Sequence, residues 1–267
     1  MRRVRLTLEY DGTGFHGWQR QATGERTVQG VIEQALDRLP GKRGPLCAAG
    51  RTDAGVHALA MVAHVDKETD LPDERLRLAL NAHLPREITV LDVVTAPDGF
   101  EAQFDCTYRR YLYRLKVYRD QPAGLALERD RVLPVFRRLD VEAMDMAAET
   151  FVGARDLSVF ATQETRSRTR TVYLCALERC REELRLHVAA DGFLRNMVRA
   201  MVGTLLWVGK GRLSPDDMHG ILESRDRTCA GNNVPPQGLY FVEAGYRDWD
   251  RVRSDTVARE RISSVLG

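Results

Sequence analysis

The sequence lacks the features that mark a membrane, secreted or metal-binding protein. No apolar run approaches the roughly 18 residues that a membrane-spanning helix needs. The five cysteines are odd in number and show no C-x-x-C spacing, so we expect neither a disulfide framework nor a zinc site. The charged N-terminus is not followed by an apolar run, which argues against a signal peptide. Together these absences favour a cytoplasmic protein in a reducing compartment.

Lysine is also scarce, since it supplies only four of the 40 basic residues and arginine supplies the rest. A formal net charge of +2 excludes a polycation. A GC-rich genome is one explanation of this arginine bias, and phosphate binding by the planar guanidinium group is the other. Only clustering of the arginines can distinguish these two explanations. The 267 residues, 43% hydrophobic and 29% charged, are typical of one large globular domain or two modest ones.

Hydropathy patterning predicts the same order of elements twice, β-α-β-β-α-β. In the first hundred residues we expect strands at 2–10, 46–49, 59–65 and 88–94, with helices beginning at Thr27 and Pro72. In the rest we expect strands at 107–117, 169–177, 184–189 and 239–244, a helix capped by Asp140, a helix over 193–208, and a short extra helix with Ser214 at its cap. This order indicates an α+β protein with two ferredoxin-like halves and a cleft between them.

The boundary between the halves is expected near Pro97 to Cys106. We therefore predict an N-terminal half over residues 1–105 that carries an aspartate loop. A C-terminal half would span 106–248, and 249–267 would form a charged tail.

The segment Gly12–Gly17 spells G-x-G-x-x-G after the first predicted strand. In a dinucleotide-binding fold this turn opens a helix whose N-terminus holds the pyrophosphate. Here helical periodicity begins only at Thr27, so we predict a surface loop rather than a nicotinamide site. Its side chains suit contact with nucleic acid better, namely Phe15, His16, Trp18, Arg20 and Gln21.

Residues 106–119 are basic and aromatic and contain no acid. Positive charge with interleaved rings is typical of a nucleic-acid surface, whereas an edge strand with solvated arginines is the alternative. A second arginine cluster at 166–170 favours nucleic acid. The predicted RNA-binding residues are Arg109, Arg110, Arg114, Arg166 and Arg168.

The segment Gly50–His57 brackets Arg51 and Asp53 with glycines in a predicted loop. A tight glycine turn can hold a carboxylate at a loop tip, and a nearby cation would keep it ionised in a desolvated pocket. The alternative is an Asx-turn that only caps the loop. The motif has no second carboxylate, which does not favour a glycosidase, and the histidines and cysteines show no metal-ligand spacing.

In their order along nearly the whole chain, these motifs resemble those of the bacterial tRNA pseudouridine synthase A family. The opening loop and the Gly50–His57 signature are similar to that family's, and the segment Asp156–Phe160 is looser than its pattern. Three later motifs also match, at Arg109–Tyr113, Phe193–Arg199 and Gly238–Tyr240.

The resemblance implies an isomerase that converts uridine to pseudouridine at positions 38, 39 and 40 in the anticodon stem-loop of tRNA. It implies no cofactor and a homodimer, with the RNA-binding and dimerisation surfaces on the C-terminal half over 106–248. By the same resemblance, Asp53 is the essential carboxylate and Arg199 its salt-bridge partner. Tyr111 stacks on the base and handles a proton, Arg51 fills the space of the extruded base or holds its phosphate, and Leu239 packs on the pyrimidine.

The chemistry suits one anionic oxygen. The reaction breaks the N1–C1′ bond and forms a C5–C1′ bond, so the sugar carbon becomes electron-poor. A carboxylate can stabilise that charge, attack it, or remove a sugar proton, and the sequence leaves these routes open. An RNA-binding protein of the same fold without catalysis is the other class of function.

Overall fold

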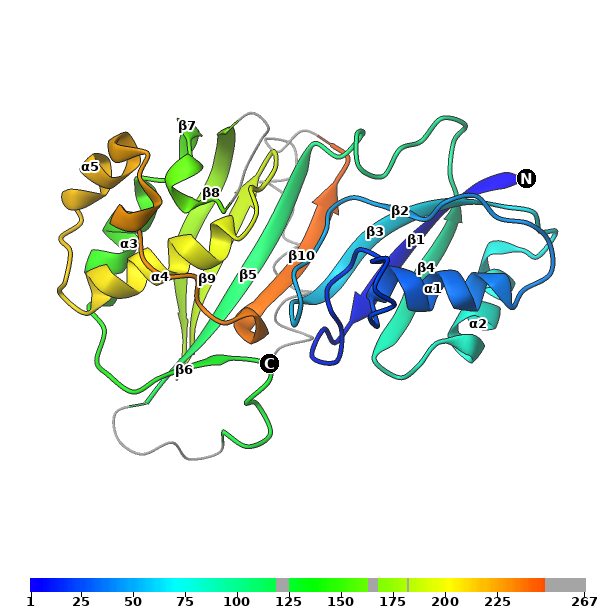
Figure 1. The fold of residues 1–267 in the computed structure, drawn as a ribbon, viewed down its shortest axis with the longest axis horizontal. Coiled ribbons are helices and arrows are strands. Elements are labelled where there is room, and N and C mark those ends of the chain that lie inside the picture. Colours follow the sequence, from blue (N-terminus) through cyan, green and yellow to red (C-terminus); the bar gives the residue numbers. More distant parts are fainter. Residues whose placement is uncertain (119–124, 163–167, 182, 248–267) are drawn as a thin grey trace. The chain divides into compact units, whose positions relative to one another are not determined.

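The computed structural model describes residues 1–118, 125–162, 168–181 and 183–247 (Figure 1). The chain divides into two compact units. Of the described residues, the first unit contains 1–109 and 241–247, and the second contains those between Arg110 and Tyr240. The predicted division after residue 105 falls four residues earlier than this one, and the predicted tail at 249–267 lies outside the described residues.

The first unit has the strand order expected of a ferredoxin-like half. Its elements are β1 (Arg2–Tyr10), α1 (Val28–Asp37), β2 (Cys47–Ala48), β3 (His57–Lys67), α2 (Asp73–His83) and β4 (Ile88–Thr95). The strands run in the order β4-β1-β3, β2 also pairs with β3, and these pairings are antiparallel. The end of β10 (Leu239–Gly245) lies beside β3 in the same unit.

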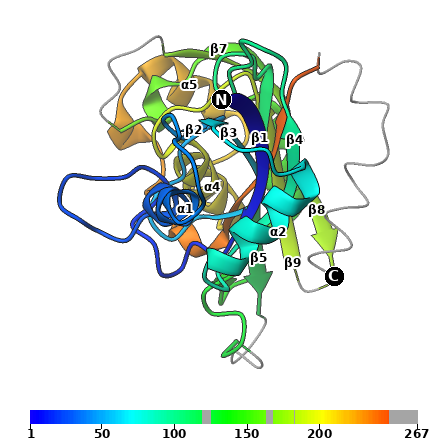
Figure 2. The same cartoon turned by 90° about the vertical axis from the view of Figure 1, so that its right-hand side faces the viewer.

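The alternating apolar side chains of β1 lie in the core of this unit. Val4, Leu6 and Leu8 are fully buried, while the residues between them are partly exposed. The helix α1 begins after Thr27, whose hydroxyl accepts a hydrogen bond from the Gly30 N–H, so the predicted start is confirmed. Figure 2 shows α1 and α2 side by side, and both helices bury their apolar faces.

The second unit repeats the arrangement with additions. It contains most of β5 (Tyr108–Val117), then β6 (Leu133–Val135), α3 (Val141–Glu149), β7 (Gly153–Asp156), β8 (Thr169–Cys180), β9 (Glu183–Ala190), α4 (Met197–Gly209) and α5 (Asp217–Ser224). The strand order is β5-β9-β8-β7, and β6 runs parallel to β5. Single turns of 3-10 helix lie at Ser158–Phe160, Arg227–Cys229 and Pro236–Gly238. The predicted α+β class is confirmed, and no helix of the described residues is long and apolar enough to cross a membrane.

Two helix starts differ from the prediction. The helix predicted from Phe193 begins at Met197, because Asn196 has a φ of 62° and so stands in the left-handed region, which cannot continue a right-handed helix. The short helix α5 begins at Asp217 rather than just after Ser214. Ser214 and Asp217 nevertheless exchange the reciprocal bonds of a capping box, so the predicted capping residue is used and only the boundary shifts.

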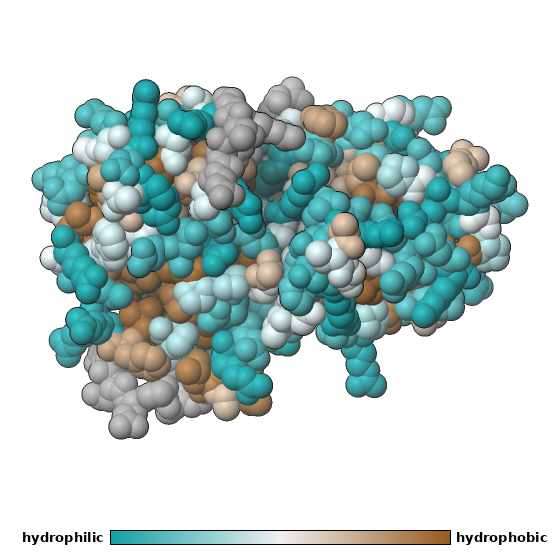
Figure 3. All heavy atoms as spheres, in the orientation of Figure 1, coloured by the Kyte–Doolittle hydropathy of each residue, from teal (hydrophilic) through white to brown (hydrophobic). Residues whose placement is uncertain are grey.

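The second unit also exposes apolar side chains. Phe136, Met146 and Val152 are 51%, 57% and 39% exposed. In Figure 3, brown apolar spheres gather in the region where Figure 1 draws α3 and α4. Apolar patches on a protein surface often mark sites of association.

Candidate active site

The loop between β2 and β3 carries the two charged residues that the sequence singled out. Arg51 is exposed and Asp53 is partly exposed, whereas Thr52 between them is buried. The Val56 N–H donates to the Asp53 carbonyl, which closes a turn around the aspartate (3.2 Å). The loop therefore presents the Asp53 side chain at the surface of the first unit and fixes its backbone beneath.

A second segment, residues 10–18, holds this loop from below. The Trp18 N–H donates to the Thr52 carbonyl (3.0 Å), and the Gly55 N–H donates to the Phe15 carbonyl (3.3 Å). The Tyr10 hydroxyl and Thr52 Oγ1 are 2.8 Å apart in a buried hydrogen bond. The segment that resembled a dinucleotide turn is thus a support for the Asp53 loop.

The glycines of that segment are explained by close backbone approach. A Cβ on Gly12 would lie 2.1 Å from the Val56 carbonyl oxygen. Gly17 has a φ of +86°, and its Cβ would lie 2.8 Å from the Thr52 carbonyl oxygen. The predicted contact of Phe15 and Trp18 with nucleic acid is wrong, because both rings are buried in the unit.

His57, the first residue of β3, closes the far side of the loop. It is buried, and its Nδ1 accepts a hydrogen bond from the Gly12 N–H (3.1 Å). The same nitrogen lies 3.2 Å from Asp11 Oδ1.

Arg109 is tied to backbone on three sides. Its guanidinium donates to the carbonyls of Ala49 (2.9 Å), Cys106 (3.3 Å) and Gln103 (2.7 Å). Ala49 immediately precedes the Asp53 loop, so this arginine anchors the chain that enters the loop. Its predicted contact with RNA stays a prediction.

Three further predicted site residues lie in the second unit. Tyr111 is buried, and its ring meets Phe193 edge-on with centroids 4.8 Å apart. Arg199 donates to the Val234 carbonyl (2.7 Å) and to Asn196 Oδ1 (2.9 Å). Leu239 is buried at the start of β10. The predicted pair of Asp53 with Arg199 would join the two units and stays a prediction.

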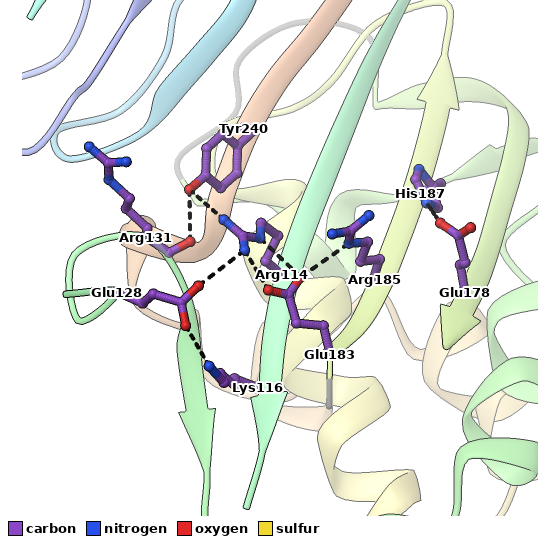
Figure 4. Close-up of polar contacts among 9 residues, drawn as sticks. All are labelled: Arg114, Lys116, Glu128, Arg131, Glu178, Glu183, Arg185, His187 and Tyr240. Atoms are coloured by element: carbon purple, nitrogen blue, oxygen red, sulfur yellow. Dashed lines mark hydrogen bonds and ion pairs between the residues drawn. The ribbon is translucent and has the colours of Figure 1, made fainter. Parts of the chain in front are cut away.

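Arg114 lies at the centre of an ionic cluster (Figure 4). Its guanidinium pairs with the Glu183 carboxylate and lies 3.5 Å from Glu128, which in turn pairs with Lys116. Although burial disfavours its charged form, the Glu183 carboxylate holds the pKa of Arg114 above its usual value. The cluster also reaches the Tyr240 hydroxyl, which donates to the Arg131 carbonyl (2.8 Å).

The other predicted RNA-binding arginines differ in exposure. Arg110 is buried, like Arg114, with 8% of its surface accessible. Arg168 is exposed, and Arg166 lies outside the described residues. Among Arg110, Arg114 and Arg168, which the structure describes, Arg168 is thus the one most accessible to a phosphate.

The described residues also contain a surface hollow and lack a cluster of metal-ligating side chains. A hollow of about 710 Å³ lies between the segment Gln19–Glu25 and α1. Arg20 and Gln21, two of the side chains that suit contact with nucleic acid, line it, whereas Asp53 and Arg51 do not. Across the described ranges, no three His, Cys, Asp or Glu side chains gather closely enough to hold a metal ion.

Known proteins match most of this chain. Residues 7–109 and 147–247 match the family described as tRNA pseudouridine synthase. The tRNA pseudouridine synthase A of Zymomonas mobilis is 44% identical over 249 residues, covering 92% of this chain and 100% of that protein. That of Caldicellulosiruptor bescii is 41% identical over 248 residues, with the same coverage. A chain from the crystal structure of a Cbf5-Nop10-Gar1 complex has 13% identity and a TM-score of 0.31, covering 76% of this chain and 45% of that one.

The family to which this chain belongs is shown by the sequence comparisons and not by the structural comparison. They include the Asp53 loop and parts of both units, and they mark an isomerase that acts on RNA. The chain belongs to the tRNA pseudouridine synthase family.

Proposed function

We propose that this protein converts uridine to pseudouridine in tRNA, at positions 38, 39 and 40 of the anticodon stem-loop. The observation that carries the proposal is the Asp53 loop. It lies in the range that matches the family, it is held by hydrogen bonds from residues 10–18, and Asp53 is partly exposed. A fixed carboxylate that solvent and substrate can reach is what the chemistry at C1′ requires.

The roles of the other side chains follow from what the base must do. Once the N1–C1′ bond breaks, the uracil must be retained while it turns. A tyrosine ring face at Tyr111 and the aliphatic side chain of Leu239 can hold it without fixing its orientation. Arg199 would keep Asp53 ionised, because a cation nearby lowers the pKa of a carboxylate. Arg51, which is exposed, would enter the space that the extruded base leaves.

The tRNA itself must be gripped and locally opened. Extruding a stacked nucleotide costs roughly a few kcal/mol, which arginine contacts to the phosphates would offset. Arg168 is exposed for such a contact. Arg109, Arg110, Arg114 and Arg166 remain proposed members of the same surface.

The direct test uses an unmodified tRNA transcript labelled with tritium at C5 of uridine. Pseudouridine formation replaces the C5–H bond, so the label is released, and mapping of the product gives its position. We expect release with the purified chain alone, and none with Asp53→Asn, which should still bind tRNA. Asp70→Asn, an exposed acid in the same unit, is the matched control and should keep full activity.

Two results would overturn the proposal. Full activity of Asp53→Asn would remove this carboxylate from the chemistry. Tight tRNA binding without any tritium release from the unaltered chain would favour the other class, an RNA-binding protein without catalysis.

We also propose that the protein works as a homodimer in the cytoplasm. The exposed apolar side chains of the second unit, Phe136 and Met146 among them, support an association surface. Sedimentation analysis at micromolar concentration should give twice the 30.2 kDa chain mass, and a monomer would contradict the dimer. Cell fractionation tests the location.

A further inference from the structure

We propose that Tyr10, Thr52 and His57 form a positioning clamp that fixes the backbone on both sides of Asp53 and thereby sets the rate of its reaction. The inference rests on the proposed function, since it concerns the same aspartate. It assigns these residues no contact with the substrate. They would act through the loop alone.

The first arm of the clamp holds the residue before the aspartate. Thr52 Oγ1 and the Tyr10 hydroxyl are 2.8 Å apart, and both residues are less than a tenth exposed. The Thr52 carbonyl accepts a second bond, from the Trp18 N–H (3.0 Å). Side chain and backbone of Thr52 are therefore both restrained, which leaves its peptide little freedom to rotate.

The second arm holds the chain four residues after the aspartate. His57 is 3% exposed, and its Nδ1 accepts the Gly12 N–H (3.1 Å). Removing this acceptor would leave a buried N–H without that partner, which is costly. The Gly12 backbone also contacts Val56 so closely that it has no room for a Cβ.

Both arms start from one short piece of chain. Tyr10 is the last residue of β1, Gly12 follows two residues later, and β1 is paired on both sides, with β3 and β4. The end of a strand that is paired on both sides is held rigidly. The clamp therefore restrains the turn around Asp53 through hydrogen bonds to a rigid part of the sheet. A misplacement of about 1 Å at a reacting group costs on the order of a hundredfold in rate.

The clamp predicts a particular kinetic signature. In Tyr10→Phe only the hydroxyl is lost and the ring still fills its place. We expect kcat for tritium release to fall on the order of tenfold or more, with KM for tRNA unchanged. The matched control is Tyr246→Phe, which removes another tyrosine hydroxyl of the same unit, one that donates to the Ala102 carbonyl (2.9 Å). Its kcat should stay at the wild-type value.

Conservative variants separate positioning from packing. Thr52→Ser keeps the hydroxyl and should hold kcat, whereas Thr52→Val keeps the volume without the hydroxyl and should lose it. His57→Asn places an acceptor oxygen near the position of Nδ1 and should retain more of kcat than His57→Phe. Melting temperatures measured in parallel show that each variant is folded under assay conditions.

The outcomes distinguish this inference from the proposed function. If the unaltered chain releases no tritium from tRNA, the proposed function fails. If it is active and Tyr10→Phe and Thr52→Val keep its kcat, the clamp is refuted while the proposed function stands. A fall in kcat for Tyr246→Phe equal to that for Tyr10→Phe would also refute the clamp. Loss in Thr52→Val together with retention in Thr52→Ser would support it, even if Tyr10→Phe failed to fold.

Discussion

Gly12→Ala is the substitution for which the structure gives the most definite expectation. The added Cβ would lie 2.1 Å from the Val56 carbonyl oxygen, whereas real Cβ contacts stay at or above 3.0 Å. The two backbones must therefore separate by about 0.9 Å. Val56 lies three residues after Asp53 and hydrogen-bonds to its carbonyl, so the shift reaches the aspartate. A displacement of this size at a reacting group predicts a fall in kcat on the order of a hundredfold.

The assay is tritium release from labelled tRNA, with tRNA binding and melting temperature measured on the same preparations. Gly14→Ala is the control within the same loop, because its Cβ would meet only the flexible side chain of Arg26, at 3.1 Å. We expect Gly14→Ala to keep its activity and Gly12→Ala to lose it while still binding tRNA. A folded Gly12→Ala protein with wild-type kcat would refute the argument, since the loop would then tolerate the movement.

Three further predictions concern stability and binding. Lys67 is fully buried and donates to three backbone carbonyls just beyond α1, so Lys67→Met should lower the free energy of unfolding by about 3 kcal/mol in urea titrations. Burial lowers the pKa of His64, so on acidification the unfolded chain binds a proton at this residue before the folded protein does. The free energy of unfolding should therefore keep the full contribution of His64 above about pH 6.5, and that contribution should fall as the pH drops towards the pKa of the folded state. His64→Asn keeps an acceptor for the Ala102 N–H and should make that acid loss shallower in thermal melts at several pH values, though not abolish it, because burial also lowers the pKa of His187. If about six phosphates are contacted, log Kd for tRNA should change with log salt with a slope of roughly 4 to 5, and a flat titration would argue against an arginine surface.

Periodic segments were predictable because burial alone determines their pattern. Alternation in β1 and the capped start of α1 were visible in the sequence, and the structure confirms both. The strands β6 and β7 were not predicted, because three or four residues are too few to show a period. The start of α4 was missed because an apolar run says nothing about the left-handed backbone of Asn196.

The sequence predicted the aspartate of the candidate site but not the residues that support its loop. The sequence identified Asp53 from a loop flanked by glycines and from a resemblance. It did not show why glycine stands at positions 12 and 17. The reason is that each backbone passes close to a carbonyl group about 40 residues away in the chain, which leaves no room for a Cβ. Arg114 illustrates the same limit. It counts as free positive charge in a sequence, yet Glu183, 69 residues later on the neighbouring strand β9, neutralises it.

The composition of the first unit has a consequence for how the protein is made. The part of β10 that lies beside β3 begins at Phe241, whereas the rest of the unit ends at Arg109. During translation the amino-terminal module must wait, with the part of β3 that lies beside β10 still unpaired, until the 131 intervening residues have left the ribosome. An unpaired strand flank is a template for wrong partners. A nascent chain stalled before residue 239 should therefore be more prone to aggregation and proteolysis than the finished protein.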